Sequence, residues 1–256
     1  MNVYSNKRGQ VTVFIIIALV IVILGVLIYL LWPRIFSTAG LDVKNPEGFL
    51  QECVEKDLKE SITTLSLQGG EFNPTNYYLY DDAKLNYLCY TNEYYKLCKV
   101  QEPFLQNSME DKLTNNISFK VNECWDSLIQ SYEKKAYTVS SKKGTLKTEI
   151  LPEKVILRFT GYELSTTKDD IEIHKSFNII LNSNIYELLE FASNIVEWEA
   201  TIGEADMWSY MMFFKHIKAE KIKQTDDTKV YIITNKNTGE KFQFASRSLA
   251  FPPGIF

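Results

Sequence analysis

The chain has 256 residues, including 28 Lys or Arg, 32 Asp or Glu and two His, so its formal net charge is −4. This acidic balance argues against a nucleic-acid partner, because binding to phosphate backbones depends on clustered cations. The length is sufficient for one sizeable hydrophobic core or two small ones.

A long apolar run lies near the N-terminus. Val13 to Leu31 contains no charged side chain, and 16 of these 19 residues are Ile, Leu, Val or Phe. As a helix the run would be about 28 Å long, close to the roughly 30 Å hydrocarbon core of a bilayer. A secretory signal has a shorter apolar region, about 7–15 residues, followed by a small-residue cleavage site. We therefore expect a retained transmembrane helix over residues 11–32.

Charge predicts the orientation of this helix. Lys7 and Arg8 are the only ionised side chains before it, whereas all 32 anions and the other 26 cations follow it. Short basic flanks stay in the cytoplasm. The sequence thus predicts the cell membrane as its location, the lipid bilayer as a partner, and the following order: a cytoplasmic flank at residues 1–10, the helix at 11–32, a linker at 33–44 and an extracytoplasmic domain at 45–256.

The segment KRGQVTVF at residues 7–14 resembles the class III signal peptide of archaeal type IV pilin-like proteins. The whole opening also resembles archaeal single-span proteins that carry a domain outside the membrane. The resemblance implies cleavage between Gly9 and Gln10. Pilin-like subunits usually carry Glu at the fifth mature position, where this chain has Phe14. A carboxylate within a membrane is costly without a partner, so its absence favours a lone anchor over a packed filament spine.

Two helices are predicted at the start of the domain by apolar side chains spaced three and four residues apart. Asn45-Pro46-Glu47 is typical of a helix start, and Gly69-Gly70 of its end. Ser108 and Asp111 have capping-box spacing and predict the start of the second helix. Its expected buried stripe is Met109, Leu113, Ile117, Val121, Trp125, Leu128 and Ile129.

All four cysteines, Cys53, Cys89, Cys98 and Cys124, follow the apolar run. Four cysteines outside a membrane favour two disulfides, for which three pairings are possible. Cys53 lies within the first helical stripe and Cys124 lies beside the second. We expect the two helices to pack, so that Cys53 pairs with Cys124 and Cys89 closes a small loop with Cys98.

The rest of the chain predicts strands and further helices. The apolar period shifts toward two after Tyr137, and the turn Asn235 to Gly239 indicates a closing hairpin. Helices followed by strands predict an α+β fold with a mainly antiparallel sheet, in a helical cystine-containing part (45–132) and a sheet-plus-helix part (133–256). The expected elements are strands at 136–140, 145–150, 155–160 and 171–181, a helix capped by 182–184, an apolar segment at 205–218 and a hairpin of 229–234 with 240–245.

The sequence lacks the common motifs of catalysis, nucleotide binding and metal binding. We expect no cofactor and no metal ion, and we do not expect an enzyme. His174 falls in an alternating strand pattern. His216 follows an aromatic-rich segment and is interpreted as a helix-terminal cation or a core histidine.

Tyrosine is the most enriched feature. Seven tyrosines occur within 19 residues: Tyr77, Tyr78, Tyr80, Tyr87, Tyr90, Tyr94 and Tyr95. Tyrosine offers rigid amphipathic contact area, so these residues are a possible binding patch for an envelope protein or a glycan. Cross-strand packing in a hairpin is the alternative, and the favoured one. The sequon Asn116-Ile117-Ser118 marks Asn116 as a possible glycosylation site.

The sequence therefore predicts a single-pass, membrane-anchored cell-surface protein that binds envelope partners or has a structural role in the envelope. The alternative is a pilin-like filament subunit processed between Gly9 and Gln10. An extracytoplasmic enzyme is the third possibility.

Overall fold

The computed structural model describes residues 16–23, 45–168 and 170–250. The chain divides into two compact units, residues 1–42 and 43–256, and each is described by itself. In the first unit, residues 16–23 form a helix with exposed side chains. Across the described residues, no helix combines the length and the apolar character needed to cross a bilayer. Four predicted features lie wholly or largely outside the described residues: the flank at 1–10, the Gly9–Gln10 junction, the span at 11–32 and the linker at 33–44.

The second unit begins with α2 (Pro46–Leu67), which starts where the sequence predicted. The side-chain oxygen of Asn45 accepts a hydrogen bond from the Gly48 N–H at 3.0 Å, and this caps the first turn. The helix ends at a pair of glycines, because Gly69 and Gly70 adopt φ values of +71° and +79°. Only glycine enters this region without a steric penalty.

α3 (Leu105–Lys134) begins three residues before the predicted Ser108. The Ser108 N–H donates to the Phe104 carbonyl at 2.9 Å, so Ser108 already lies within the first turn. The predicted capping box was therefore wrong. The Ser108 N–H group, which a capping box would pair with the Asp111 side chain, is bonded to a main-chain carbonyl instead. Of the predicted stripe, all but the half-buried Ile129 are buried: Met109, Leu113, Ile117, Val121, Trp125 and Leu128.

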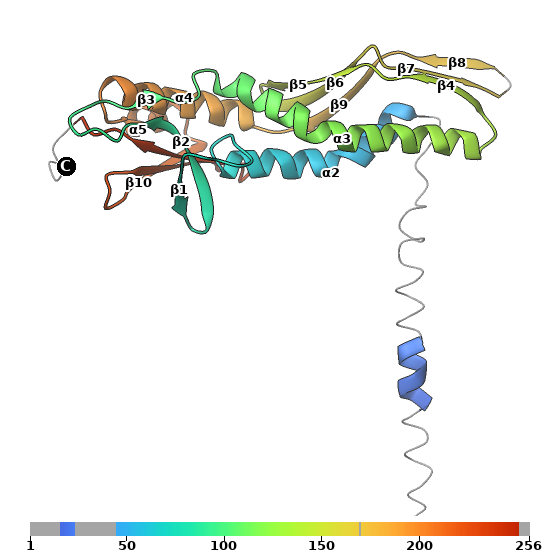
Figure 1. The fold of residues 1–256 in the computed structure, drawn as a ribbon, viewed down its shortest axis with the longest axis horizontal. Helices are drawn as coiled ribbons and strands as arrows, with labels where there is room; N and C mark the ends of the chain where they lie inside the picture. Colours follow the sequence, from blue (N-terminus) through green and yellow to red (C-terminus); the bar gives the residue numbers. More distant parts are fainter. Residues whose placement is uncertain (1–15, 24–44, 169, 251–256) are drawn as a thin grey trace, which may run out of the picture. The chain divides into compact units, whose positions relative to one another are not determined.

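Two disulfides link the first part of this unit, and both pairings are the expected ones. Cys53 on α2 is bonded to Cys124 on α3, with their Cα atoms 6.0 Å apart. Cys89 is bonded to Cys98, with Cα atoms 5.4 Å apart. All four cysteines of the chain are therefore paired. Figure 1 shows α2 and α3 running side by side, as the first disulfide requires.

A six-stranded sheet joins segments from the two predicted parts of the domain. Its path runs β1-β2-β12-β11-β10, and β3 adds to β2. The β2–β12 pair is parallel and the other pairs are antiparallel. Residues 45–132 and 133–256 are thus structurally interdependent. The strands are β1 (Tyr77–Tyr80), β2 (Ala83–Tyr90), β3 (Lys99–Val100), β10 (Ile217–Lys223), β11 (Lys229–Asn235) and β12 (Lys241–Arg247).

The segment between α3 and α4 in the chain forms two three-stranded antiparallel sheets. The strand predicted at 171–181 is wrong as a single element, because it forms two strands in different sheets. Ile171 and Ile173 are exposed in the first, whereas Phe177 and Ile179 are buried in the second. The strands are β4 (Thr138–Lys142), β7 (Glu163–Thr167) and β8 (Ile171–His174) in one sheet, and β5 (Thr145–Leu151), β6 (Lys154–Thr160) and β9 (Phe177–Asn182) in the other.

Two helices follow these sheets. α4 (Ile185–Thr201) packs on β11 and β12 through its buried face. α5 (Met207–Phe213) is shorter than the predicted 205–218 segment, because the chain enters β10 at Ile217. The fold is therefore α+β, with helices covering mainly antiparallel sheets, as predicted.

Candidate functional site

A pocket of about 620 Å³ lies between α4, α5 and the turn that joins β11 to β12. Its volume falls within the roughly 300–1,000 Å³ typical of small-molecule sites. The tight turn between β5 and β6 completes its wall. The lining residues are Pro152, Glu153, Asn184, Tyr186, Glu187, Glu190, Phe191, Asn194, Tyr210, Phe214, His216, Ile217, Asn235 and Asn237. We call this the α4–α5 pocket.

Aromatic rings form one wall of the α4–α5 pocket. Tyr210 and Phe214 are stacked, with ring centroids 5.5 Å apart and an interplanar angle of 20°. Phe191 is buried on α4 and meets Tyr210 edge-on at 4.6 Å. Phe214 is 40 % exposed, so a ligand can reach it. Phe191 therefore fixes Tyr210, Tyr210 supports Phe214, and Phe214 is the accessible apolar ring of the pocket.

A hydrogen-bonded pair crosses the pocket from α4 to the start of β10. The imidazole Nε2 of His216 lies 2.7 Å from Oε1 of Glu187, and both side chains are about one-third exposed. Phe214 meets the His216 ring edge-on at 6.3 Å. The pair therefore holds the imidazole in a fixed orientation beside the aromatic wall, with solvent access to both groups.

The first turn of α4 is fixed by a residue from the distant hairpin. The Glu240 carboxylate accepts hydrogen bonds from the Ser183 hydroxyl at 2.6 Å and from the Asn184 N–H at 2.7 Å. Ser183 in turn accepts from the Ile185 N–H at 3.2 Å. Asn184 is the N-cap by position, but its side chain makes no capping hydrogen bond. The Asn184 amide is therefore not used by the helix and lies at the pocket wall.

The β11–β12 turn contributes two further amides. The side-chain oxygen of Asn235 accepts from the N–H groups of Asn237 and Thr238, at 2.9 and 3.3 Å. These bonds hold the turn, in which Asn235 is buried and the exposed Asn237 side chain lines the pocket. The pocket thus combines fixed donors and acceptors with its apolar wall.

The charges that line the α4–α5 pocket are mostly negative. Glu153, Glu187 and Glu190 are carboxylates, and His216 is the one basic side chain among the lining residues, which all lie in the described part of the chain. Lys and Arg are missing from this set. Because an anion needs cationic partners when it leaves water, the pocket disfavours phosphate, sulfate or carboxylate ligands.

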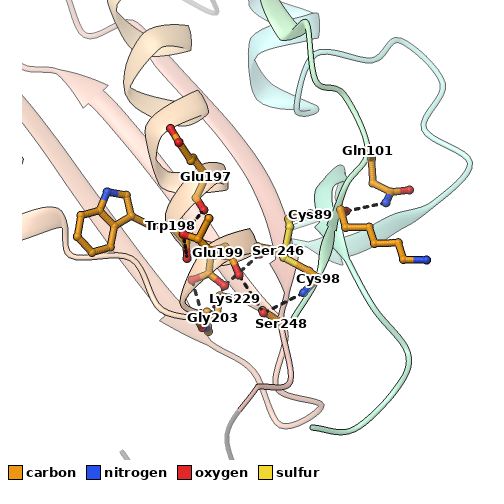
Figure 2. Close-up of a disulfide and its surroundings, with 12 residues drawn as sticks. Cys89, Cys98, Gln101, Glu197, Trp198, Glu199, Gly203, Lys229, Ser246 and Ser248 are labelled. Atoms are coloured by element: carbon orange, nitrogen blue, oxygen red, sulfur yellow. Dashed lines mark hydrogen bonds and ion pairs between the residues drawn. A yellow bond between two sulfur atoms is a disulfide. The ribbon is translucent and has the colours of Figure 1, made fainter. Parts of the chain in front are cut away.

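A buried ion pair lies at the opposite end of α4, beside the Cys89–Cys98 disulfide (Figure 2). Lys229 Nζ lies 3.0 and 2.9 Å from the two carboxylate oxygens of Glu199, and both side chains are buried. The Tyr231 hydroxyl donates to the same carboxylate at 2.5 Å. Burial, together with the Glu199 charge, raises the pKa of Tyr231 well above its usual value. These bonds fasten α4 to β11.

The Glu199–Lys229 ion pair is also connected to the loop closed by Cys89 and Cys98, and to a second carboxylate, Glu204. Ser248 donates to the Glu199 carbonyl at 3.0 Å and accepts from the Cys98 N–H at 3.1 Å. Glu204 forms an ion pair with Lys229 at 3.0 Å and also bonds Lys221. Burial lowers the pKa of Lys221, and the Lys229 charge lowers it further. The network joins α4, the sheet and the cystine loop, and its lysines are saturated by internal partners.

Comparison with known proteins finds no match: no family model, no curated protein and no solved structure is significantly similar to this chain. A functional assignment therefore depends on the chemistry of the residues themselves.

The predicted tyrosine patch does not form one surface. Tyr78, Tyr80 and Tyr90 pack against a buried cluster that contains Tyr87, Leu85, Val230 and Ala245. The remaining three are exposed: Tyr77, Tyr94 and Tyr95. Four of the seven rings therefore serve cross-strand packing, which was the favoured interpretation. A role in binding stays a prediction for the exposed three.

The predicted glycosylation residue Asn116 lies in the middle of α3, and its side chain is exposed. Its amide oxygen accepts a hydrogen bond from the Ser61 hydroxyl on α2 at 2.9 Å. The amide nitrogen, which is the atom that carries a glycan, has no such partner in the described residues. Glycosylation of Asn116 stays a prediction.

The two histidines lie in different surroundings. His174 is on β8, as the strand pattern predicted, and its Nε2 atom is 3.9 Å from the Glu172 carboxylate, beyond hydrogen-bond distance. His216 lies in the α4–α5 pocket, in the short connection between α5 and β10. The sequence did not predict this site. Among the described residues, no group of three or more His, Cys, Asp or Glu side chains could hold a metal ion.

Proposed function

We propose that the protein is a single-pass envelope protein that presents residues 45–256 outside the membrane as a ligand-binding domain. The apolar run from Val13 to Leu31 and its basic flank support the anchor. The two disulfides support the location of the domain, because structural disulfides persist in oxidising compartments and are rare in the cytosol.

The observation that carries the binding role is the α4–α5 pocket. It joins a rigid aromatic pair, Tyr210 and Phe214, to a fixed Glu187–His216 pair within one concave site. Binding sites of small molecules combine apolar walls with a few placed polar groups in this way.

The location of the domain can be tested by its thiol state. Cells are lysed in acid, and the full-length protein is denatured without reductant in the presence of an alkylating reagent. Because all four cysteines are paired, we expect no alkyl group before reduction and four after it. Four alkylated cysteines before reduction would contradict the extracytoplasmic location.

The filament subunit is the second candidate, and the KRGQ segment at residues 7–10 favours it. Phe14 argues against a filament subunit, because the packed helices of a filament usually carry an acidic residue at this position. Sequencing the N-terminus of the mature protein from a membrane fraction separates the two. A start at Met1 supports the lone anchor, and a start at Gln10 supports pilin-type processing.

An extracytoplasmic enzyme is the third candidate. The α4–α5 pocket holds three carboxylates and an imidazole, groups that can transfer protons. Glycoside hydrolysis needs only a pair of carboxylates, so the lining residues are compatible with turnover as well as with binding, and activity on sugars has to be tested directly. Release of new reducing ends from neutral oligosaccharides by the purified protein would support the enzyme instead.

A further inference from the structure

We propose that the α4–α5 pocket binds a neutral carbohydrate, with the stacked Tyr210–Phe214 pair as the platform for a sugar ring and Glu187, His216 and the wall amides as its hydrogen-bond partners. The proposal rests on the binding function above and names the chemical class of the ligand. It follows from the shape of the aromatic wall, the hydrogen-bonding groups and the charge of the pocket.

The aromatic wall has the form of a platform. The carbon-bound hydrogens of a sugar ring make one of its faces apolar and slightly positive, which suits the negative face of an aromatic ring. Tyr210 and Phe214 are stacked at 5.5 Å, so each ring covers one face of the other, and the 40 % exposed Phe214 is the ring that a sugar would contact. Phe191 is only 3 % exposed and meets the Tyr210 ring edge-on at 4.6 Å, so Tyr210 is held against the core while it supports Phe214.

The polar groups of the pocket match hydroxyls. A hydroxyl both donates and accepts hydrogen bonds, so a sugar needs partners of both kinds. Glu187, already fixed by His216, supplies acceptor oxygens. Asn184 and Asn237 supply amides that can act in either sense. A ligand with a single charged group would not need this mixture of hydrogen-bond donors and acceptors.

The charge of the pocket separates a neutral sugar from other ligands. Three carboxylates and no Lys or Arg line it, which disfavours phosphorylated, sulfated or uronic-acid ligands. A quaternary ammonium ion would suit the negative charge, but it is bound by several ring faces arranged around one point. Here the Tyr210 and Phe214 faces are nearly parallel and Phe191 is buried, so the rings do not form such a cage.

The test uses full-length protein in a detergent without a sugar headgroup, because maltoside detergents carry the proposed ligand class. Saturation-transfer NMR is recorded with glucose, mannose, galactose, N-acetylglucosamine and their neutral oligosaccharides, and affinities are measured by calorimetry. Tetramethylammonium and inorganic phosphate are included as probes of the other ligand classes. We expect at least one neutral sugar to bind and neither ion to compete with it.

Matched variants locate the binding site. Phe214→Ala removes the platform ring and is expected to weaken sugar binding about tenfold. Phe213→Ala is its control, because the neighbouring ring is 84 % exposed and does not line the pocket. Asn237→Ala removes a turn amide without removing its backbone hydrogen bond to Asn235, and is expected to weaken binding several-fold.

The result has clear alternatives. Any of three results would overturn the proposal: tetramethylammonium or phosphate binds in place of sugars, no sugar binds, or the Phe214→Ala and Phe213→Ala proteins have equal affinities. The thiol state of the cysteines is independent of all these measurements. Fully oxidised cysteines without sugar binding would leave the surface location standing and remove the carbohydrate ligand alone.

Discussion

Lys229 on β11 and Glu199 on α4 form an ion pair with an Nζ–Oε2 distance of 2.9 Å, and both side chains are buried. Burying two charges is costly, and the cost is offset here by a full set of partners. Glu199 accepts from Lys229, Tyr231 and Ser246, while Lys229 also donates to the Gly203 carbonyl. The pair therefore fixes where α4 sits on the sheet, and α4 also carries one wall of the α4–α5 pocket.

Replacing Glu199 by Ala is predicted to destabilise the protein by about 3–5 kcal/mol, because it leaves the Lys229 charge buried without its partner. Urea unfolding of the full-length protein in micelles measures the free energy of unfolding. Glu197→Ala is the control on the same helix, since its side chain is exposed, and we expect a change within about 0.5 kcal/mol. Equal effects of the two substitutions would contradict the structural role of the pair.

The combined Glu199→Leu and Lys229→Met protein is predicted to be more stable than either single variant. Removing both charges together leaves no uncompensated ion, whereas removing one does. The same urea unfolding experiment compares the three proteins. If the double variant is as unstable as the sum of the singles, the two residues do not act as a pair.

Tyr231 is predicted to make the protein sensitive to alkaline pH. Its folded-state pKa lies above the value of about 10 in the unfolded chain, because burial and the Glu199 charge oppose ionisation. The folded state then holds the proton more tightly, so this contribution is complete below pH 10 and is lost as the pH rises through the folded-state pKa. The free energy of unfolding should fall less steeply above pH 10 for Tyr231→Phe than for the native chain, and parallel curves would refute this.

The two disulfides are predicted to differ in their contribution to stability. They close loops with sequence separations of 71 and 9 residues. The chain-entropy model assigns about 4.4 kcal/mol to the long loop and about 2.6 kcal/mol to the short one. Thermal unfolding should therefore show a larger loss for the Cys53→Ala/Cys124→Ala protein than for the Cys89→Ala/Cys98→Ala protein. The reverse order would show that bonds around the short loop outweigh the loop entropy.

The helices and the cystine pairing could be predicted from the sequence because their signals are local. The apolar stripes repeat at helical spacing over many residues, and Cys53 and Cys124 lie at or beside those stripes. Once the helices pack, one of the three possible pairings is clearly favoured. The start of α3 was misplaced because Ser108 has cap-like neighbours but lies inside the first turn.

The missed strands lack a strong apolar alternation. β7 reads ELSTT, in which one of the two buried residues is the polar Thr166, and β10 reads IKAEKIK, in which charged residues separate the few apolar ones. The parallel pairing of β2 with β12 joins residues such as Tyr87 and Ala245 that are far apart in the chain. A single sequence without this pairing information therefore does not reveal that one sheet joins strands from both predicted parts.

The α4–α5 pocket could not be predicted because its residues come from four separate segments. His216 and Glu187 are 29 residues apart in the chain and become partners only in the folded domain. The one usable signal was the cluster of Tyr210, Phe214 and His216 within seven residues. Aromatic clusters of this kind are more often core than ligand site. The tyrosine-rich segment showed the same ambiguity, and there most of the rings proved to be packing residues.

The most direct test of the membrane-anchored account is protease accessibility on intact cells that produce the full chain with an epitope at each end. We predict that added protease removes the C-terminal epitope without lysis, whereas the N-terminal epitope is protected until the membrane is opened. Protection of both epitopes, with the protein released into the soluble fraction without detergent, would contradict the account.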